Sequence, residues 1–202
     1  MRRIENLYLA GPEVWFPNVG AHFAVRQAMC ENAGFSLLQA DTAELREMEP
    51  GEVMAREIYA ERVARMRRAD AVIINLTPWR GPAADTGAAF EAGFLSGLGK
   101  PVWAYMNISY EHDAEYRDRV DAHFGAQLDE DGVWRDGEGC LIEDFGLPET
   151  IMLWAEARRL FVIVTPDTLG DDRAAAVPGR RASLRGRLGR PMTDKRPTPG
   201  TR

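Results

Sequence analysis

The sequence predicts an α/β fold, with a doubly wound and mostly parallel sheet flanked by helices. Short apolar segments bounded by Gly and Pro alternate with longer segments of helical spacing, and this alternation implies βαβ units with right-handed crossovers. The apolar segment 71–76, AVIINL, has almost no polar alternation, as expected of a parallel strand covered on both faces. Ligands of such sheets bind beyond the carboxyl ends of the strands.

The first half of the chain contains three expected strands and two expected helices. Gly11 and Pro12 close the first strand, and Gly34 ends the first helix. The second helix is amphipathic, because its apolar residues are spaced among charges. In chain order, the predicted elements are a strand at 4–10, a helix at 19–33, a strand at 35–38, a helix at 53–68 and a strand at 71–76.

The second half continues the alternation. Asp85 is a suitable N-cap for one helix, Gly99 stops that helix, and Pro148 suits the first turn of the last helix. Segment 125–146 is rich in Gly, Asp and Glu, which indicates an insertion or a long loop. The other predicted elements are a helix at 85–98, a strand at 101–106, a helix at 112–124 and a helix at 148–164.

Composition indicates one domain at 1–165, followed by a basic tail at 166–202. The chain has 202 residues, of which 45% are hydrophobic, and this suits a single full core. The tail has nine Lys/Arg, four Asp/Glu and almost no large apolar residues, so we expect it to be disordered. An arm that binds nucleic acid or an anionic surface is the alternative. The net charge of −6 makes general nucleic-acid binding unlikely.

Several classes of protein are disfavoured by the sequence. Cys30 and Cys140 have no metal-ligand spacing, and we expect both to stay reduced in a cytoplasmic protein. The three His residues are scattered, so no metal is predicted, and the absence of a GxGxxG motif or a P-loop disfavours the common nucleotide cofactors. No apolar segment approaches the ~20 residues of a membrane span. We therefore expect neither a cofactor nor a membrane partner.

The most informative segment for function is 85–94, DTGAAFEAGF. Helical side chains lean toward the amino terminus of their helix, so Glu91 leans over the small residues Gly87 and Ala88. Asp85 at the N-cap is a second carboxylate, and the helix dipole favours ionised carboxylates there by ~0.3–1 kcal/mol. Two carboxylates in unequal environments suit glycosyl transfer through a covalent intermediate. A simple cap and a solvated Glu are the alternatives.

Four segments carry a resemblance to a known family. They are NLYLAGPEVW (6–15), NLTPWRGPAADTGAAFEAGF (75–94), GKPVWAYMN (99–107) and IEDFGLPETIML (142–153). Together they resemble the nucleoside 2-deoxyribosyltransferase family over most of residues 4 to 160. The resemblance implies a flavodoxin-like fold and transfer of 2-deoxyribose from one nucleobase to another. The implied partners are a nucleoside or nucleotide, a free nucleobase and further copies of the chain in a homo-oligomer.

The resemblance also implies roles for individual residues. Glu91 would be the nucleophile that attacks C1′ of the sugar, Asp85 would bind the base or manage its proton, and Tyr8 would orient Glu91. Trp15 and Trp79 would stack on a base, an interaction worth ~1–3 kcal/mol, unless they pack in the core. The full set of residues implied to line the substrate pocket is Gly11, Trp15, Asn75, Trp79, Arg80, Gly81 and Gly87.

Two positions depart from the family pattern. Arg62 stands where the family usually has Asn or Asp on the helix before the third strand. Thr150 stands where an Asn commonly reaches a neighbouring subunit's site. Arg62 could meet a substrate phosphate or face solvent. The departures motivate one alternative, an N-glycoside hydrolase of nucleosides or nucleoside 5′-monophosphates. A second alternative is a non-catalytic nucleotide-binding module that has kept the pocket.

Overall fold

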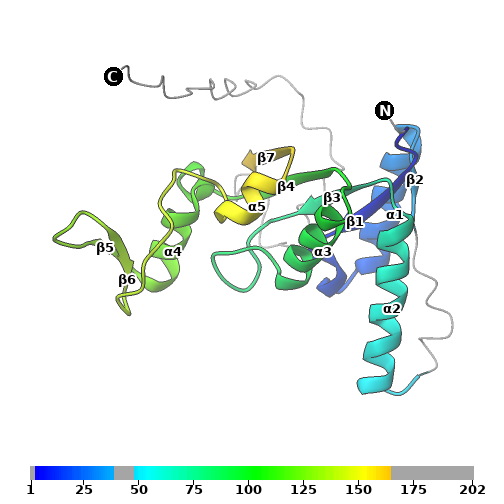
Figure 1. Cartoon of the computed structure of the whole chain (residues 1–202), viewed down its shortest axis with the longest axis horizontal. Coiled ribbons are helices and arrows are strands. Elements are labelled where there is room, and N and C mark those ends of the chain that lie inside the picture. The colour runs from blue at the N-terminus through cyan, green and yellow to red at the C-terminus, as the bar shows by residue number, and fades with distance from the viewer. Residues whose placement is uncertain (1–2, 39–47, 165–202) are drawn as a thin grey trace.

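A computed structural model describes residues 3–38 and 48–164 of the chain (Figure 1). The predicted basic tail, 166–202, lies outside the described residues. A parallel sheet of five strands forms the centre, in the order β2-β1-β3-β4-β7, which is the winding order of flavodoxin-like folds. Its strands are β1 (Asn6–Ala10), β2 (Ser36–Leu37), β3 (Ala71–Asn75), β4 (Val102–Ile108) and β7 (Arg159–Val164). The predicted α/β class is confirmed.

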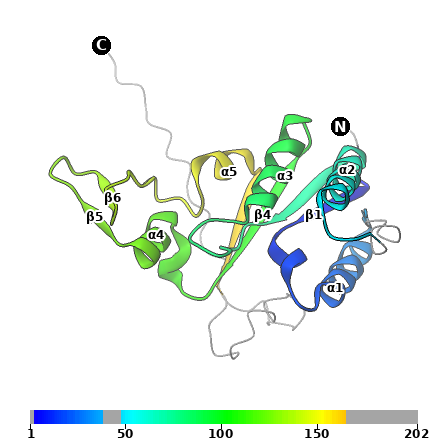
Figure 2. The same ribbon diagram turned by 90° about the horizontal axis from the view of Figure 1, so that it is seen from below.

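Helices cover both faces of this sheet (Figure 2). On one face lies α1 (Val19–Asn32), whose Cys30 packs with Leu7 and Ala71. The other face carries the larger core, in which Met66 and Leu95 are fully buried against Val72 and Ile74. The helices of that second face are α2 (Glu52–Arg68), α3 (Thr86–Gly97) and α5 (Ile151–Glu156).

The predicted adjacency of the first and third strands is confirmed. Tyr8 of β1 is in register with Val72 of β3, and Ala10 is in register with Ile74. At the amino ends of these strands, Asp70 Oδ2 accepts hydrogen bonds from the Glu5 amide (3.2 Å), the Asn6 amide (2.9 Å) and the Asn6 side chain (3.1 Å). The loops that follow the two strands therefore begin side by side.

The segment 148–164, predicted as one helix, differs from that expectation. Only α5 is helical there, and after an extended Ala157 the chain forms β7, which pairs with β4 along its whole length. The sequence of β7, RLFVIV, is rich in β-branched residues, which pack well on a pleated surface. The Pro at 148 suggested a helix start, but the β-branched run that follows decides the structure.

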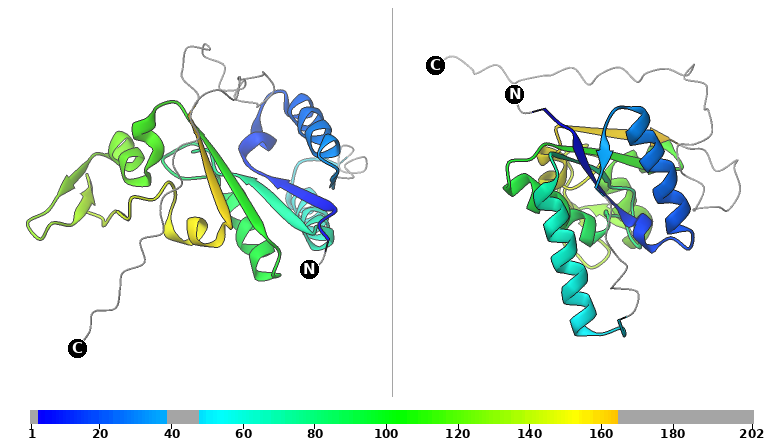
Figure 3. Two further views of the ribbon diagram at one scale, coloured as in Figure 1. Left: turned by 90° about the horizontal axis from the view of Figure 1, so that it is seen from above. Right: turned by 90° about the vertical axis from the view of Figure 1, so that its right-hand side faces the viewer.

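Segment 111–146 forms an excursion from the sheet. The helix predicted at 112–124 divides into η3 (Glu111–Ala114) and α4 (Tyr116–Phe124), because Glu115 between them is extended. The predicted insertion contains a hairpin of β5 (Ala126–Leu128) and β6 (Trp134–Asp136). Figures 1 and 3 show the hairpin standing away from the sheet. None of the described helices has both the length and the apolarity that crossing a membrane requires.

Candidate active site

Glu91 lies in the middle of the apolar face of α3. The buried residues of this helix are Ala88, Glu91, Ala92 and Leu95, so a carboxylate occupies a helical stripe that faces the sheet. Glu91 is 7% exposed, and the Tyr8 hydroxyl of β1 donates a hydrogen bond of 2.7 Å to its Oε1. A carboxylate in so apolar a setting needs such a donor. Two segments predicted to act together, 83 positions apart, are thus in direct contact.

Asp85 caps the same helix and also binds the segment that follows β1. Its Oδ1 accepts a hydrogen bond of 3.0 Å from the Ala88 amide, and its Oδ2 accepts one of 3.2 Å from Trp15 Nε1. Trp15 belongs to η1 (Pro12–Trp15), a short helix that directly follows β1. A Cβ at position 87 would lie 3.0 Å from Asp85 Oδ1, so Gly87 avoids a tight contact with the capping carboxylate. The two loops that we expected at the carboxyl ends of β1 and β3 meet here.

Two arginines of α2 complete the surroundings of Glu91. Arg62 Nη1 lies 3.5 Å from Glu91 Oε1, and the Arg62 side chain is one-third exposed. The Arg65 guanidinium lies over the Tyr8 ring, 5.4 Å from its centroid, and forms an ion pair of 2.6 Å with Glu61. Neither expectation for Arg62, a phosphate ligand or a solvent-facing side chain, includes this ion pair with the predicted nucleophile.

The protonation states of Glu91 and Tyr8 follow from their burial and from the charged groups around them. Burial raises the pKa of Glu91, whereas the Tyr8 hydrogen bond, Arg62 and Arg65 lower it, and the charge of Asp85 raises it. Burial, followed by the Glu91 charge, also raises the pKa of Tyr8. Tyr8 therefore remains a donor near neutral pH. The tyrosine and the two arginines favour the ionised glutamate against the cost of desolvation.

The structure places Asn75 and Gly11 in a buried network that sequence reasoning missed. Asn75 Nδ2 donates to Glu13 Oε1 (2.5 Å), and Asn75 Oδ1 accepts from the Thr77 amide (2.9 Å). Gly11 has a φ of 152°, and a Cβ there would lie 2.7 Å from the Asn75 Cβ. Gly11 and Asn75 therefore hold the loops after β1 and β3 in contact with each other below their surface. Their contact with a substrate stays a prediction.

Glu13 is the centre of that network. It is 4% exposed, and its Oε1 also accepts from the Tyr105 hydroxyl (3.1 Å) and forms an ion pair with Arg26 of α1. The sequence contains one signal for it, an acidic residue inside the apolar segment AGPEVW (10–15). Its partners lie in other segments of the chain, so spacing within a motif does not identify them.

The loop after β3 carries the other predicted pocket residues. The Arg80 guanidinium lies over two rings, 5.9 Å from the Trp15 centroid and 5.3 Å from that of Trp79. Arg80 has a φ of 57°, which is uncommon for a residue with a side chain, and Gly81 follows with a φ of 157°. Trp79 is half-buried and packs against Phe16 at a centroid distance of 5.5 Å. Trp15 and Trp79 thus both lie against Arg80, where the two loops meet. Their stacking on a base stays a prediction.

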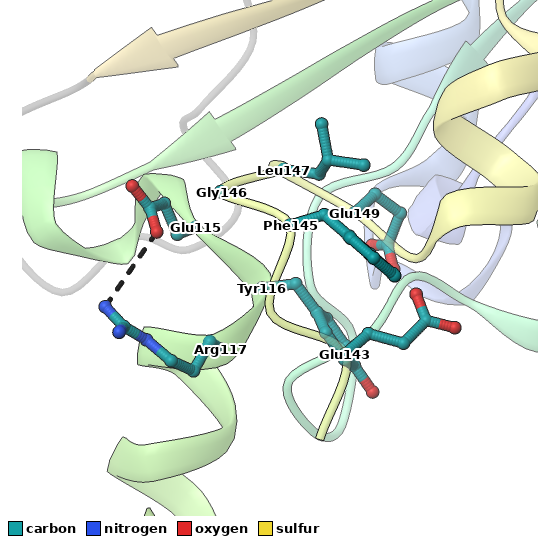
Figure 4. Close-up of a pocket in the computed structure, with 8 residues that line it drawn as sticks. All are labelled: Glu115, Tyr116, Arg117, Glu143, Phe145, Gly146, Leu147 and Glu149. Atoms are coloured by element: carbon teal, nitrogen blue, oxygen red, sulfur yellow. Dashed lines mark ion pairs between the residues drawn. The ribbon is translucent and has the colours of Figure 1, made fainter. Parts of the chain in front are cut away.

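The segment before α5 is tied to the same loop. Glu149, 1% exposed, accepts from the Ala84 amide (3.2 Å) and lies 3.6 Å from Arg119 of α4. Thr150, the second departure, is the N-cap residue of α5. Glu149 also lines a shallow hollow with Tyr116 and Phe145 (Figure 4). This hollow includes none of the predicted site residues.

Comparisons with known proteins agree with the fold and identify a family. Residues 7–152 match the family model described as nucleoside 2-deoxyribosyltransferase. An uncharacterized protein of Schizosaccharomyces pombe is 26% identical over 159 residues, which cover 74% of this chain and 75% of that protein. The structure is similar to 2-desoxiribosyltransferase from Leishmania mexicana, with a TM-score of 0.52 and 25% identity over 74% of this chain and 85% of the other.

A second solved structure, a 2-deoxyribosyltransferase from Bacillus psychrosaccharolyticus, has a TM-score of 0.42 and 22% identity over 50% of this chain and 72% of the other. The matched segment 7–152 contains all of β1 except Asn6, the loops after β1 and β3, and all of α3. It therefore includes Tyr8, Asp85 and Glu91, the residues that the structure brings together. The chain belongs to the nucleoside 2-deoxyribosyltransferase family.

Proposed function

We propose that this protein transfers 2-deoxyribose between nucleobases through a covalent intermediate on Glu91. The observation that carries the proposal is the contact between Tyr8 and Glu91, 2.7 Å long, inside the segment that the family model matches. A buried glutamate whose oxygen is held by a phenol and an arginine is oriented, as a nucleophile must be, and both of these partners favour its charged form. The name of the Leishmania mexicana relative supports the same activity.

The proposed reaction has two halves. In the first, a Glu91 oxygen attacks C1′ of a deoxynucleoside, the C1′–N bond breaks, and its electron pair leaves with the base, which takes up a proton. In the second, a nitrogen of another base attacks C1′, the C1′–O bond breaks, and the carboxylate of Glu91 is regenerated. Two displacements give net retention at C1′. Asp85, next to Trp15 and the start of α3, binds the base or carries its proton.

A product assay tests this proposal. The purified protein is incubated with each natural 2′-deoxynucleoside, and separately with each 5′-monophosphate, with and without a different free base, and the products are separated by chromatography. We expect a new deoxynucleoside only when an acceptor base is present. Release of free sugar or sugar phosphate without an acceptor would identify the hydrolase alternative. Binding by calorimetry without turnover would identify the non-catalytic module.

A pair of variants ties the activity to the proposed nucleophile. Glu91→Ala should abolish base exchange, because no carboxylate remains to attack C1′. Glu57→Ala is the matched control, since Glu57 is an exposed glutamate of α2. Near-normal exchange by a folded Glu91→Ala protein would remove the mechanism. The homo-oligomer implied by the resemblance stays a prediction, which light scattering of the purified protein checks.

A further inference from the structure

Arg62 is the cation that contacts the proposed nucleophile. Within residues 3–38 and 48–164, no other Lys or Arg lies within ion-pair distance of Glu91. Its Nη1 is 3.5 Å from Glu91 Oε1, the same oxygen that accepts the Tyr8 hydrogen bond. The Glu91 side chain is 9% exposed and that of Arg62 is 33% exposed, so bulk solvent screens this pair only in part.

We propose that Arg62 is a positioning residue that makes Glu91 a good leaving group in the second half of the reaction, and so limits the lifetime of the deoxyribosyl-enzyme. This inference rests on the proposed function. It assigns Arg62 a role in the breakdown of the intermediate and not in the binding of a substrate phosphate.

The charge changes in the two halves support this role. When Glu91 Oε bonds to C1′ and the C1′–N electron pair leaves with the base, the carboxylate becomes a neutral ester and Arg62 loses its partner. When the acceptor nitrogen attacks C1′, the C1′–O electron pair returns to Glu91 and the acceptor proton passes to Asp85 or to water. A fixed positive charge stabilises a transition state in which negative charge develops beside it. Arg62 therefore opposes the first half and favours the second.

The other groups around Glu91 do not replace this charge. Tyr8 donates a hydrogen bond from β1 but carries no charge. Arg65 of α2 is directed to the Tyr8 ring and to Glu61. Asp85, at the start of α3, is anionic and acts in the opposite sense. Removal of Arg62 should therefore slow the breakdown of the intermediate specifically.

The experiment compares wild-type protein, Arg62→Gln and Arg62→Lys at pH 8, with 2′-deoxyinosine as donor and adenine as acceptor. For Arg62→Gln we expect a burst of hypoxanthine equal to the enzyme concentration, followed by turnover about tenfold slower than that of the wild type. Intact-mass spectrometry should then detect the deoxyribosyl adduct on most of the protein. Arg62→Lys keeps the charge and should restore most of the turnover.

One further readout and one control variant separate this role from a structural one. The acid limb of hypoxanthine release should move to higher pH in Arg62→Gln, because the glutamate has lost a cation while Tyr8, Arg65 and Asp85 still face it. Arg56→Gln is the matched control: Arg56 lies on the same helix in an exposed pair with Glu52 (2.6 Å). Its turnover should equal that of the wild type.

The outcomes distinguish this inference from the function on which it rests. An active wild type whose Arg62→Gln variant loses burst and turnover equally, with no adduct, overturns the role of Arg62 and leaves the proposed function intact. So does a folded variant with wild-type turnover. A wild type that releases no base from any deoxynucleoside overturns the proposed function, and this inference with it.

Discussion

Two buried glutamates, Glu13 and Glu91, lie near the loops after β1 and β3, and they differ in how their oxygens are used. Glu13 Oε1 accepts from Asn75 and Tyr105 and pairs with Arg26, whereas Glu91 Oε1 accepts one hydrogen bond, from Tyr8, and has Arg62 at 3.5 Å. Their exposures, 4% and 7%, are almost equal. The two carboxylates therefore differ in the number of protein groups bound to them and not in burial, and this difference supports the role proposed for Glu91.

Glu149 belongs with Glu13 in this comparison. It accepts from the amides of Ala84 and Thr150 and lies 3.6 Å from Arg119, whose own guanidinium donates to the carbonyls of Pro82 and Pro148. Through these contacts, α4 and the segment before α5 bind the loop after β3, which leads to Asp85. Glu13 and Glu149 each bind three protein groups and hold the loops in place, whereas Glu91 contacts only Tyr8 and Arg62 among its hydrogen-bond and ion-pair partners in the described residues.

The largest expected effect separates the two glutamates directly. Glu91→Gln should lower base exchange by about 10³-fold or more, because an amide is not a nucleophile at C1′. Glu13→Gln should retain exchange within about tenfold but lower the free energy of unfolding by ~2 kcal/mol, because Arg26 loses its charged partner. Initial rates and urea denaturation check both. Equal losses of exchange in the two variants would contradict the different roles assigned to Glu13 and Glu91.

Removal of Glu149 should have the largest effect on stability. Glu149→Ala leaves the buried Arg119 without its carboxylate and should lower the free energy of unfolding by ~3 kcal/mol. Denaturant titration followed by circular dichroism measures this. Arg135→Ala, which removes a partly exposed ion pair of 2.7 Å with Asp129, is the control and should cost less than ~1 kcal/mol. Similar costs for the two variants would contradict a structural role for Glu149.

The Tyr8→Phe variant tests how far the phenol controls the pKa of Glu91. Without the phenol, Glu91 loses a hydrogen bond that lowers its pKa, so burial raises that pKa further. We expect exchange near neutral pH to fall by about tenfold and the acid limb of the pH–rate profile to move to higher pH. An unshifted acid limb would show that the titrating group in the profile is not Glu91.

The smallest expected effect is a dependence of stability on pH. Burial raises the folded-state pKa of Glu91 above the ordinary value that a glutamate has in the unfolded chain. The folded protein therefore holds a proton that the unfolded chain has released, and the free energy of unfolding falls as pH rises through that interval. Glu91→Gln lacks this titration. It should be more stable than the wild type above the interval and equally stable at pH 4, as thermal unfolding at the two pH values would show.

Local signals in the sequence were sufficient for most of the fold and for part of the site. Apolar runs ended by Gly and Pro located β1, β3 and α3, and the spacing within α3 placed Glu91 on an inward face. The strand β7 was missed because a Pro and mixed apolar spacing resemble a helix start. Its membership of the sheet depends on pairing with β4, a contact between distant segments.

The missed parts of the site share one physical cause. The partners of Glu13 lie 62 and 92 positions away in Asn75 and Tyr105, so its role exists only after the sheet has formed. Likewise, Arg62 meets Glu91 because of the rotation of α2 about its own axis as it packs on α3, which a one-dimensional pattern does not fix. Motifs in the sequence suggested candidate residues, and the packing of the elements determines which residues they contact.

Asp70 has a consequence for the chemistry although it lies at the opposite end of the strands from the loops. Its three hydrogen bonds to Glu5 and Asn6 anchor the start of β1 against the start of β3. Successive side chains of a strand point to opposite faces, so a slip of one residue would turn the Tyr8 phenol toward α1 and leave Glu91 facing an aliphatic neighbour. The alignment of the proposed nucleophile is thus set by an anchor at the far edge of the sheet.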